Sequence, residues 1–140
     1  MVRQAEGRDL FDVYRIYCQR YESGDASAIK YTEGDFEWYL NAGGNSRIFV
    51  VEEEGKVVGF SLVYDMGLWG YLEFIVVDRH HREAGHARKL MDRIYELAVV
   101  REWSTIEACY YEGSHMKDFA KHMGYEDGGI TTRWVFRDVL

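Results

Sequence analysis

The chain has 140 residues, of which 47% are hydrophobic and 29% charged, and its formal net charge is −7. This size and balance predict one globular domain over residues 1–140. The acidic charge argues against a general nucleic-acid or membrane-surface binder. No apolar run approaches the ~20 residues of a membrane helix, and the N-terminus lacks the apolar core of a signal peptide. We therefore expect a cytoplasmic protein.

The first third of the chain is expected to be mainly helical. Val2–Gln4 predicts a short strand. The apolar residues of Asp9–Glu22 recur at helical spacing, and Asp9 is a candidate cap. Asp35–Asn41 predicts a second, short helix that ends at a pair of glycines.

From residue 47 the pattern changes to that of strands. Arg47–Glu52 and Lys56–Tyr64 flank a short turn and predict a hairpin. Tyr71–Val77 is apolar on both faces apart from Glu73, which is typical of a central, covered strand.

The second half of the chain alternates between helix and strand. A long amphipathic helix is predicted over Gly85–Arg101, followed by a strand at Ser104–Tyr111. Strand, helix and strand in this order favour a right-handed parallel crossover. Ser114–Met123 predicts a helix stopped by Gly124, and Thr131–Asp138 a last strand. The chain is therefore expected to be a mixed α/β domain.

The segment before the long helix concentrates positive charge in an acidic chain. Its charged residues over positions 79–90 are Arg79, Arg82, Glu83, Arg88 and Lys89. The first amides of a helix lack intrahelical partners and lie at the positive end of its dipole, which favours an anion. Gly85 lets the backbone approach a ligand closely. A phosphate site and a plain glycine-eased helix entry explain this segment about equally well.

Two other site types are set aside. A dinucleotide-binding Rossmann domain needs two βαβ halves, whereas this pattern gives one crossover after a hairpin. His80, His81 and His86 fit no common zinc spacing, so we expect no metal site.

The ordered features resemble the GNAT superfamily of N-acetyltransferases. Arg82-Glu-Ala-Gly85-His-Ala87 matches its cofactor signature of Arg or Gln, two residues, Gly, one residue, then Gly or Ala. VVEEEGKVVGFSLV is similar to the family's hairpin, YLEFIVVD to its central strand and FAKHMGY to its last helix. The resemblance implies a mostly antiparallel sheet with one parallel crossover, and a cleft where two central strands splay apart.

The resemblance also implies acetyl-CoA as co-substrate and a primary amine of a small molecule or peptide as acceptor. The pantetheine arm would pair with the backbone of Ile75, Val76 and Val77. The pyrophosphate would take backbone amides from Arg82, Glu83, Ala84, Gly85, His86, Ala87 and Arg88. Dimerisation is common in the family, so a homodimer is compatible with the resemblance.

Glu73 is the candidate general base, which would deprotonate the amine before it attacks the thioester. It is the one ionisable residue within 71–77, and the family often carries a catalytic Glu on this strand. Strand alternation places it on one face with Tyr71, Ile75 and Val77. A structural carboxylate is the alternative. The amide of Val76 or Val77 is a candidate oxyanion donor.

Three positions depart from the family pattern. The family often has Gly at Glu83, whose carboxylate would repel a pyrophosphate unless it points away. Its usual Asn after the 104–111 strand is Gly113, and its frequent helix tyrosine, a proposed acid for the thiolate, is Ala120. The acid candidates that remain are Tyr110, Tyr111, Ser114 and Tyr125. A family member that binds acyl-CoA or a protein without turnover therefore stays open, as does an interaction domain without CoA.

Overall fold

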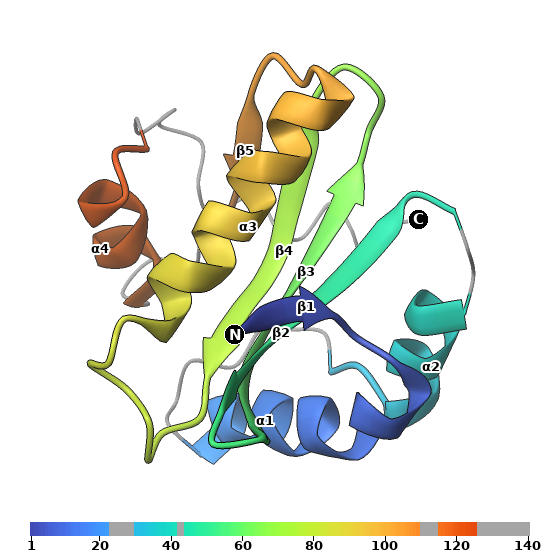
Figure 1. Ribbon diagram of the computed structural model, residues 1–140, viewed down its shortest axis with the longest axis vertical. Helices are drawn as coiled ribbons and strands as arrows, with labels where there is room; N and C mark the ends of the chain where they lie inside the picture. The colour runs from blue at the N-terminus through green and yellow to red at the C-terminus, as the bar shows by residue number, and fades with distance from the viewer. Residues whose placement is uncertain (23–29, 42–43, 110–114, 126–140) are drawn as a thin grey trace.

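A five-stranded sheet forms the middle layer of the protein (Figure 1). The computed structural model describes residues 1–22, 30–41, 44–109 and 115–125. The strands, in both chain order and sheet order, are β1 Val2–Gln4, β2 Ser46–Glu53, β3 Lys56–Asp65, β4 Gly70–Val77 and β5 Ile106–Ala108. The pairs from β1 to β4 are antiparallel, and β4 pairs with β5 in parallel. The predicted mixed fold with one parallel crossover is confirmed.

Helices cover both faces of this sheet (Figure 1). Helices α1 (Leu10–Glu22) and α2 (Glu33–Asn41) pack on one face. Helix α3 (His86–Arg101) packs on the other, where side chains of α4 (His115–His122) and the turn after it join its core. The helices were predicted to within about two residues, whereas the strand predicted at 131–138 lies outside the described residues. Within the described part of the chain, no helix combines the length and apolarity that crossing a bilayer requires.

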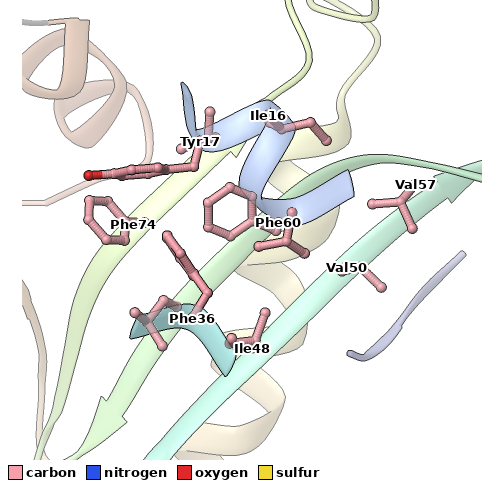
Figure 2. Packing of buried hydrophobic residues seen from close by; sticks show 11 residues of the cluster. Ile16, Tyr17, Phe36, Ile48, Val50, Val57, Phe60 and Phe74 are labelled. Atoms are coloured by element: carbon pink, nitrogen blue, oxygen red, sulfur yellow. The ribbon is translucent and has the colours of Figure 1, made fainter. Parts of the chain in front are cut away.

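Each face of the sheet has its own hydrophobic core. On the α1–α2 side, Tyr17 and Phe36 meet the strand residues Phe60 and Phe74 (Figure 2). The ring centroids of Tyr17 and Phe36 lie 4.9 Å apart, and those of Tyr17 and Phe74 lie 5.3 Å apart. On the other side, α3 buries Leu90, Met91 and Ile94 against Phe49, Val51, Val63 and Leu72. Burial on both faces explains why β2 and β3 have near-continuous apolar sequences.

Two helix starts differ from the prediction. Helix α2 begins at residue 33 because Thr32 and Asp35 cap it reciprocally: the Asp35 N–H donates to Thr32 Oγ1 (3.2 Å) and the Thr32 N–H to Asp35 Oδ2 (2.7 Å). Asp9 is not the cap of α1, since it ends a 3₁₀ turn, Gly7–Asp9. Its buried carboxylate instead pairs with Arg3 (2.7 Å) and accepts the N–H of Glu6 (2.8 Å).

The parallel pairing between β4 and β5 is short. It runs from Gly70 opposite Ile106 to Leu72 opposite Ala108. Of the strand predicted at 104–111, the described residues form β5 over Ile106–Ala108, and residues 110 and 111 lie outside the described residues. Ser104 belongs to a turn in which its N–H donates to Leu68 O (2.7 Å). Beyond Leu72, β4 continues without a β5 partner among the described residues, which matches the implied splayed cleft.

Gly70, at the start of β4, packs closely against Trp103 on the α3 side of the sheet. A Cβ at Gly70 would lie 2.3 Å from the ring of Trp103, whose indole N–H donates a 2.9 Å hydrogen bond to Asp65 Oδ1. We expect Gly70→Ala to lower the free energy of unfolding by about 1–3 kcal/mol through overpacking, measured by urea denaturation. Gly7→Ala, with no atom within 4 Å of the added Cβ, should change it by less than about 0.5 kcal/mol. Equal effects would contradict the clash.

Candidate active site

An extra residue in β4 changes the direction of its side chains. In the β3–β4 register Leu62 lies opposite Phe74 and Val63 opposite Leu72, so Glu73 has no partner residue in β3. This is a β-bulge, which shifts the phase of the alternation along the strand. Leu72 consequently packs in the α3 core, while Phe74, two residues later, packs in the α1–α2 core.

The bulge corrects the predicted neighbours of Glu73. Its Oε1 accepts a hydrogen bond from the hydroxyl of Tyr31 (2.9 Å), which packs in the α1–α2 core. Ile75 packs in the α3 core on the opposite face, and alternation after the bulge places Val77 with it. The prediction that Glu73 shares a face with Ile75 and Val77 is therefore wrong, because simple alternation assumes an uninterrupted ladder.

Glu73 lies among tyrosines. Tyr71 does share its face, as predicted, since it lies opposite Tyr64 in the register and their ring centroids are 6.4 Å apart. Burial raises the pKa of Tyr64 far above its usual value, and a hydrogen bond with Tyr39 and the negative charge of Glu73 add to the effect. The carboxylate and the phenols of Tyr31, Tyr39 and Tyr64 thus form one electrostatically coupled group.

Asp78, directly after β4, holds the start of the basic loop against α1. Its buried carboxylate accepts hydrogen bonds from Arg15 Nη1 (3.0 Å), Gln19 Nε2 (3.4 Å) and the N–H of His80 (3.0 Å). Gln19 also accepts the N–H of Arg79 (2.9 Å). Burial alone would raise the pKa of Asp78, but these hydrogen bonds and the charge of Arg15 outweigh it and hold the pKa at about 2.

Sequence reasoning missed this anchor. In the sequence, Asp78 stands out only as the last residue of the strand motif YLEFIVVD. The available signal was a pair of polar residues, Arg15 and Gln19, which are four apart and therefore lie on one face of α1.

The end of the loop presents the first turn of α3 to solvent. Gly85 precedes α3 with φ +82°. Among the residues that the structure describes, no side chain caps the helix and no atom lies within 4 Å of a Cβ built on Gly85. Residues 82–85 are exposed, as are the cationic side chains of Arg79, Arg82, Arg88 and Lys89. Open space, uncapped amides and surrounding cations fit a diphosphate.

Glu83 occupies a backbone conformation that favours glycine. Its φ is +64°, a left-handed region that costs an L residue about 1–2 kcal/mol. This explains why a glycine is common at the matching position of the family signature. The side chain of Glu83 is exposed.

His86 links the loop to the β2–β3 hairpin. It is the first residue of α3 and is buried, and its Nε2 lies 3.2 Å from Oε2 of Glu53. Its Nδ1 is buried without a hydrogen-bond partner among the described residues. His80 and His81 lie on the Asp78 side of the loop instead. In the described ranges, no three His, Cys, Asp or Glu side chains are grouped to hold a metal ion.

The backbone of β4 offers groups on its β5 side. The N–H of Asp78 donates to Val58 O in β3 (2.8 Å). Because backbone groups alternate between the two edges of a strand, those of Val76 also point to β3, whereas those of Ile75 and Val77 point away from it. The Val77 carbonyl accordingly accepts a bond from Arg82 Nε (3.3 Å).

Of the candidate acids, the structure describes Tyr125 alone; Tyr110, Tyr111 and Ser114 lie outside the described residues. Tyr125 packs in the α3 core, and its hydroxyl is buried. Burial raises its pKa above the usual value.

Comparison with known proteins identifies the family of this chain. The sequence profile of the Acetyltransferase (GNAT) family matches residues 10–125, and the chain belongs to that family. No curated protein is detectably similar in sequence.

Solved structures share the fold at low identity. A tetramutant of the BH1408 protein from Bacillus halodurans superposes with a TM-score of 0.79 at 20% identity, covering 94% of this chain and 97% of that one. The PaiA N-acetyltransferase of Thermoplasma acidophilum, in complex with coenzyme A, gives 0.77 at 12%, covering 91% and 92%. An aminoglycoside acetyltransferase from an uncultured soil metagenome, in complex with sisomicin, gives 0.75 at 17%, covering 96% and 94%. At these identities the likeness establishes the fold.

The Asp78 anchor predicts a pH dependence of stability. Its pKa in the folded protein, about 2, lies below the ordinary 3.8, so its contribution is complete above about pH 4 and is lost as the pH falls toward 2. We expect Asp78→Asn to lower the unfolding free energy by about 2 kcal/mol at pH 7, and the deficit to shrink at pH 3. Urea denaturation of both proteins at both pH values measures it. Asp12→Asn, which alters a half-exposed partner of Arg15, should cost less than about 1 kcal/mol. A deficit independent of pH would contradict the assignment.

Proposed function

We propose that this protein transfers the acetyl group of acetyl-CoA to a primary amine of a small molecule or peptide. The observation that carries the proposal is the arrangement along β4. Within the described part of the chain, a helix start without a side-chain cap follows Gly85 at one end, an edge without a β5 partner runs beyond Leu72, and Glu73 lies beside that edge. Coenzyme A in the structurally similar Thermoplasma enzyme supports the cofactor.

In this proposal the first turn of α3 binds the pyrophosphate. Backbone amides over residues 82–88 would donate to its oxygens, and Arg82 and Arg88 would add positive charge. The pantetheine arm would run along β4 and pair with the outward backbone groups of Ile75 and Val77. Glu73 and Asp78 are five residues apart, or about 16 Å along a strand, a distance that an extended pantetheine arm can span.

Glu73 would act as the general base. The acceptor enters as an ammonium ion, and one of its protons passes to the Glu73 carboxylate. The neutral amine then attacks the thioester carbonyl, so that a C–N bond forms and the C–S bond breaks. An outward N–H of Ile75 or Val77 would stabilise the oxyanion. The products are the amide, the CoA thiol and one proton released to solvent.

Solvent is the proposed proton source for the departing thiolate. A donor is effective when its pKa lies near that of the acceptor, and a thiol has a pKa of about 8.5. The raised pKa of Tyr125 moves it away from that value. Ala120 offers no proton.

Replacing Glu73 tests the chemical step. We expect Glu73→Gln to reduce kcat more than tenfold, because the amide cannot accept the proton, while acetyl-CoA binding is retained. Thiol release over a panel of amines, with product masses, measures turnover, and calorimetry measures binding. Glu37→Gln, at an exposed acid of α2, is the matched control and should behave as the wild type. Unchanged turnover in Glu73→Gln would remove it from the mechanism. A wild-type protein that binds acetyl-CoA but acetylates no amine would be a binding protein instead.

Replacing Gly85 tests the cofactor site. Both Gly85 and Gly67 have φ near +90° and open space around a built Cβ, so alanine strains either backbone by about 1–2 kcal/mol. Only Gly85 adjoins the proposed diphosphate. We expect Gly85→Ala to weaken acetyl-CoA binding about tenfold and Gly67→Ala to leave it unchanged, as measured by calorimetry. Equal affinities in the two variants would place the cofactor elsewhere.

A further inference from the structure

A row of tyrosines surrounds Glu73 on the α1–α2 side of the sheet. We call Tyr31, Tyr39, Tyr64 and Tyr71 the tyrosine wall. Its neighbouring ring centroids lie 5.9 Å apart for Tyr31 and Tyr39, 5.8 Å for Tyr39 and Tyr64, and 6.4 Å for Tyr64 and Tyr71. The Tyr31 hydroxyl bonds to Glu73. The wall brings together the segment before α2, α2 itself, β3 and β4.

The wall differs from the core that it adjoins. Tyr17, Phe36 and Phe60 are fully buried (Figure 2), whereas all four wall residues and Glu73 are only partly buried. The wall also lies where β4 leaves β5, because the parallel pairing of the described residues ends with Tyr71 and Leu72. Aromatic rings with one buried side and one accessible side, next to the proposed base, can contact an acceptor.

The charges beside the wall favour an acceptor with one positive charge. Glu73 accepts a hydrogen bond from the wall, and its negative charge acts on Tyr64. The acids of α2, Glu33, Asp35 and Glu37, are exposed, and Asp35 caps its helix. The guanidinium of Arg20 lies 4.8 Å from the ring centroid of Phe74, the residue after Glu73. A polycation would need further carboxylates here.

We infer that the acceptor is a monocationic primary amine carried on a flat, apolar body, with its nitrogen at Glu73 and its body against the tyrosine wall. This inference rests on the proposed acetyl transfer and narrows its substrate class. Flat apolar groups stack on aromatic faces, and an ammonium ion is attracted to them. A flexible chain of the same charge gains less from such a surface. The wall itself offers a polyamine or aminoglycoside no carboxylate besides Glu73 within the described part of the chain.

A panel of amines tests the inference with the full-length protein and acetyl-CoA. The probes are 2-phenylethylamine, hexylamine with the same charge and no ring, spermidine as a polyamine, kanamycin as an aminoglycoside, and an alanyl peptide. We expect kcat/KM for 2-phenylethylamine to exceed that for hexylamine at least tenfold and that for spermidine or kanamycin at least a hundredfold. Product masses identify the acetylated nitrogen.

Variants of the wall separate acceptor binding from folding and cofactor binding. We expect Tyr39→Leu and Tyr71→Leu each to raise KM for 2-phenylethylamine about tenfold, to change KM for hexylamine less than threefold, and to leave acetyl-CoA affinity unchanged. Phe11→Leu, which alters an exposed ring of α1, is the matched control and should match the wild type. Where a leucine variant fails to fold, judged by its melting temperature, Tyr39→Phe and Tyr71→Phe replace it; these should retain the ring preference.

The outcomes distinguish this inference from the function on which it rests. Preferred acetylation of spermidine, kanamycin or the peptide would overturn the acceptor class and leave acetyl transfer intact. Equal use of 2-phenylethylamine and hexylamine would also overturn it, as would wall variants that lower kcat/KM equally for both. Acetyl-CoA binding without acetylation of any amine would overturn both proposals.

Discussion

The extra residue at Glu73 is the constraint on which the site depends. A regular strand that continued the alternation of Tyr71 and Leu72 would place Phe74 in the α3 core and Ile75 on the α1–α2 side. The bulge instead keeps Glu73 on the α1–α2 side, brings Phe74 to the same side and sends Ile75 to the α3 side. It begins where the pairing with β5 ends at Leu72. One local irregularity therefore coincides with both the position of the carboxylate and the start of the β4 edge that has no β5 partner in the described ranges.

The two ends of β4 are held by different physical means. Around Glu73, packed aromatic rings fix the position of the carboxylate. At the other end, Asp78 uses charge-assisted hydrogen bonds to tie the loop to α1, and His86 ties its far end to Glu53. Between these anchors, residues 82–85 remain exposed. A loop fixed at both ends keeps its amides oriented without a ligand, which reduces the ordering cost of binding.

The protein keeps an acidic overall charge while presenting a basic loop. Net charge acts over long range and is screened within about 10 Å in ordinary salt, whereas backbone amides and nearby cations act at contact. The loop can therefore suit an anionic cofactor even though the chain carries a net charge of −7. The proposed acceptor carries one positive charge, which Glu73 would balance, and this is compatible with the same acidic net charge.

The sequence by itself determined the elements and the cofactor signature. Amphipathic spacing located α1 and α3, near-continuous apolar runs located β2, β3 and β4, and Gly124 ended α4 with its φ of +86°. These features are local, because periodicity and glycine conformation depend on neighbouring residues. The sequence also pointed to Glu73 as the one ionisable residue of its strand.

Only the tertiary structure decided which way Glu73 faces and what surrounds it. A bulge is defined by the register of two strands, and no pattern within β4 alone reveals it. The contact of Tyr31 with Glu73, across 42 positions of sequence, and that of Arg15 with Asp78, across 63, exist because α1 and the segment before α2 fold over the same face of the sheet. Such long-range contacts depend on how whole elements pack, which residue spacing does not encode.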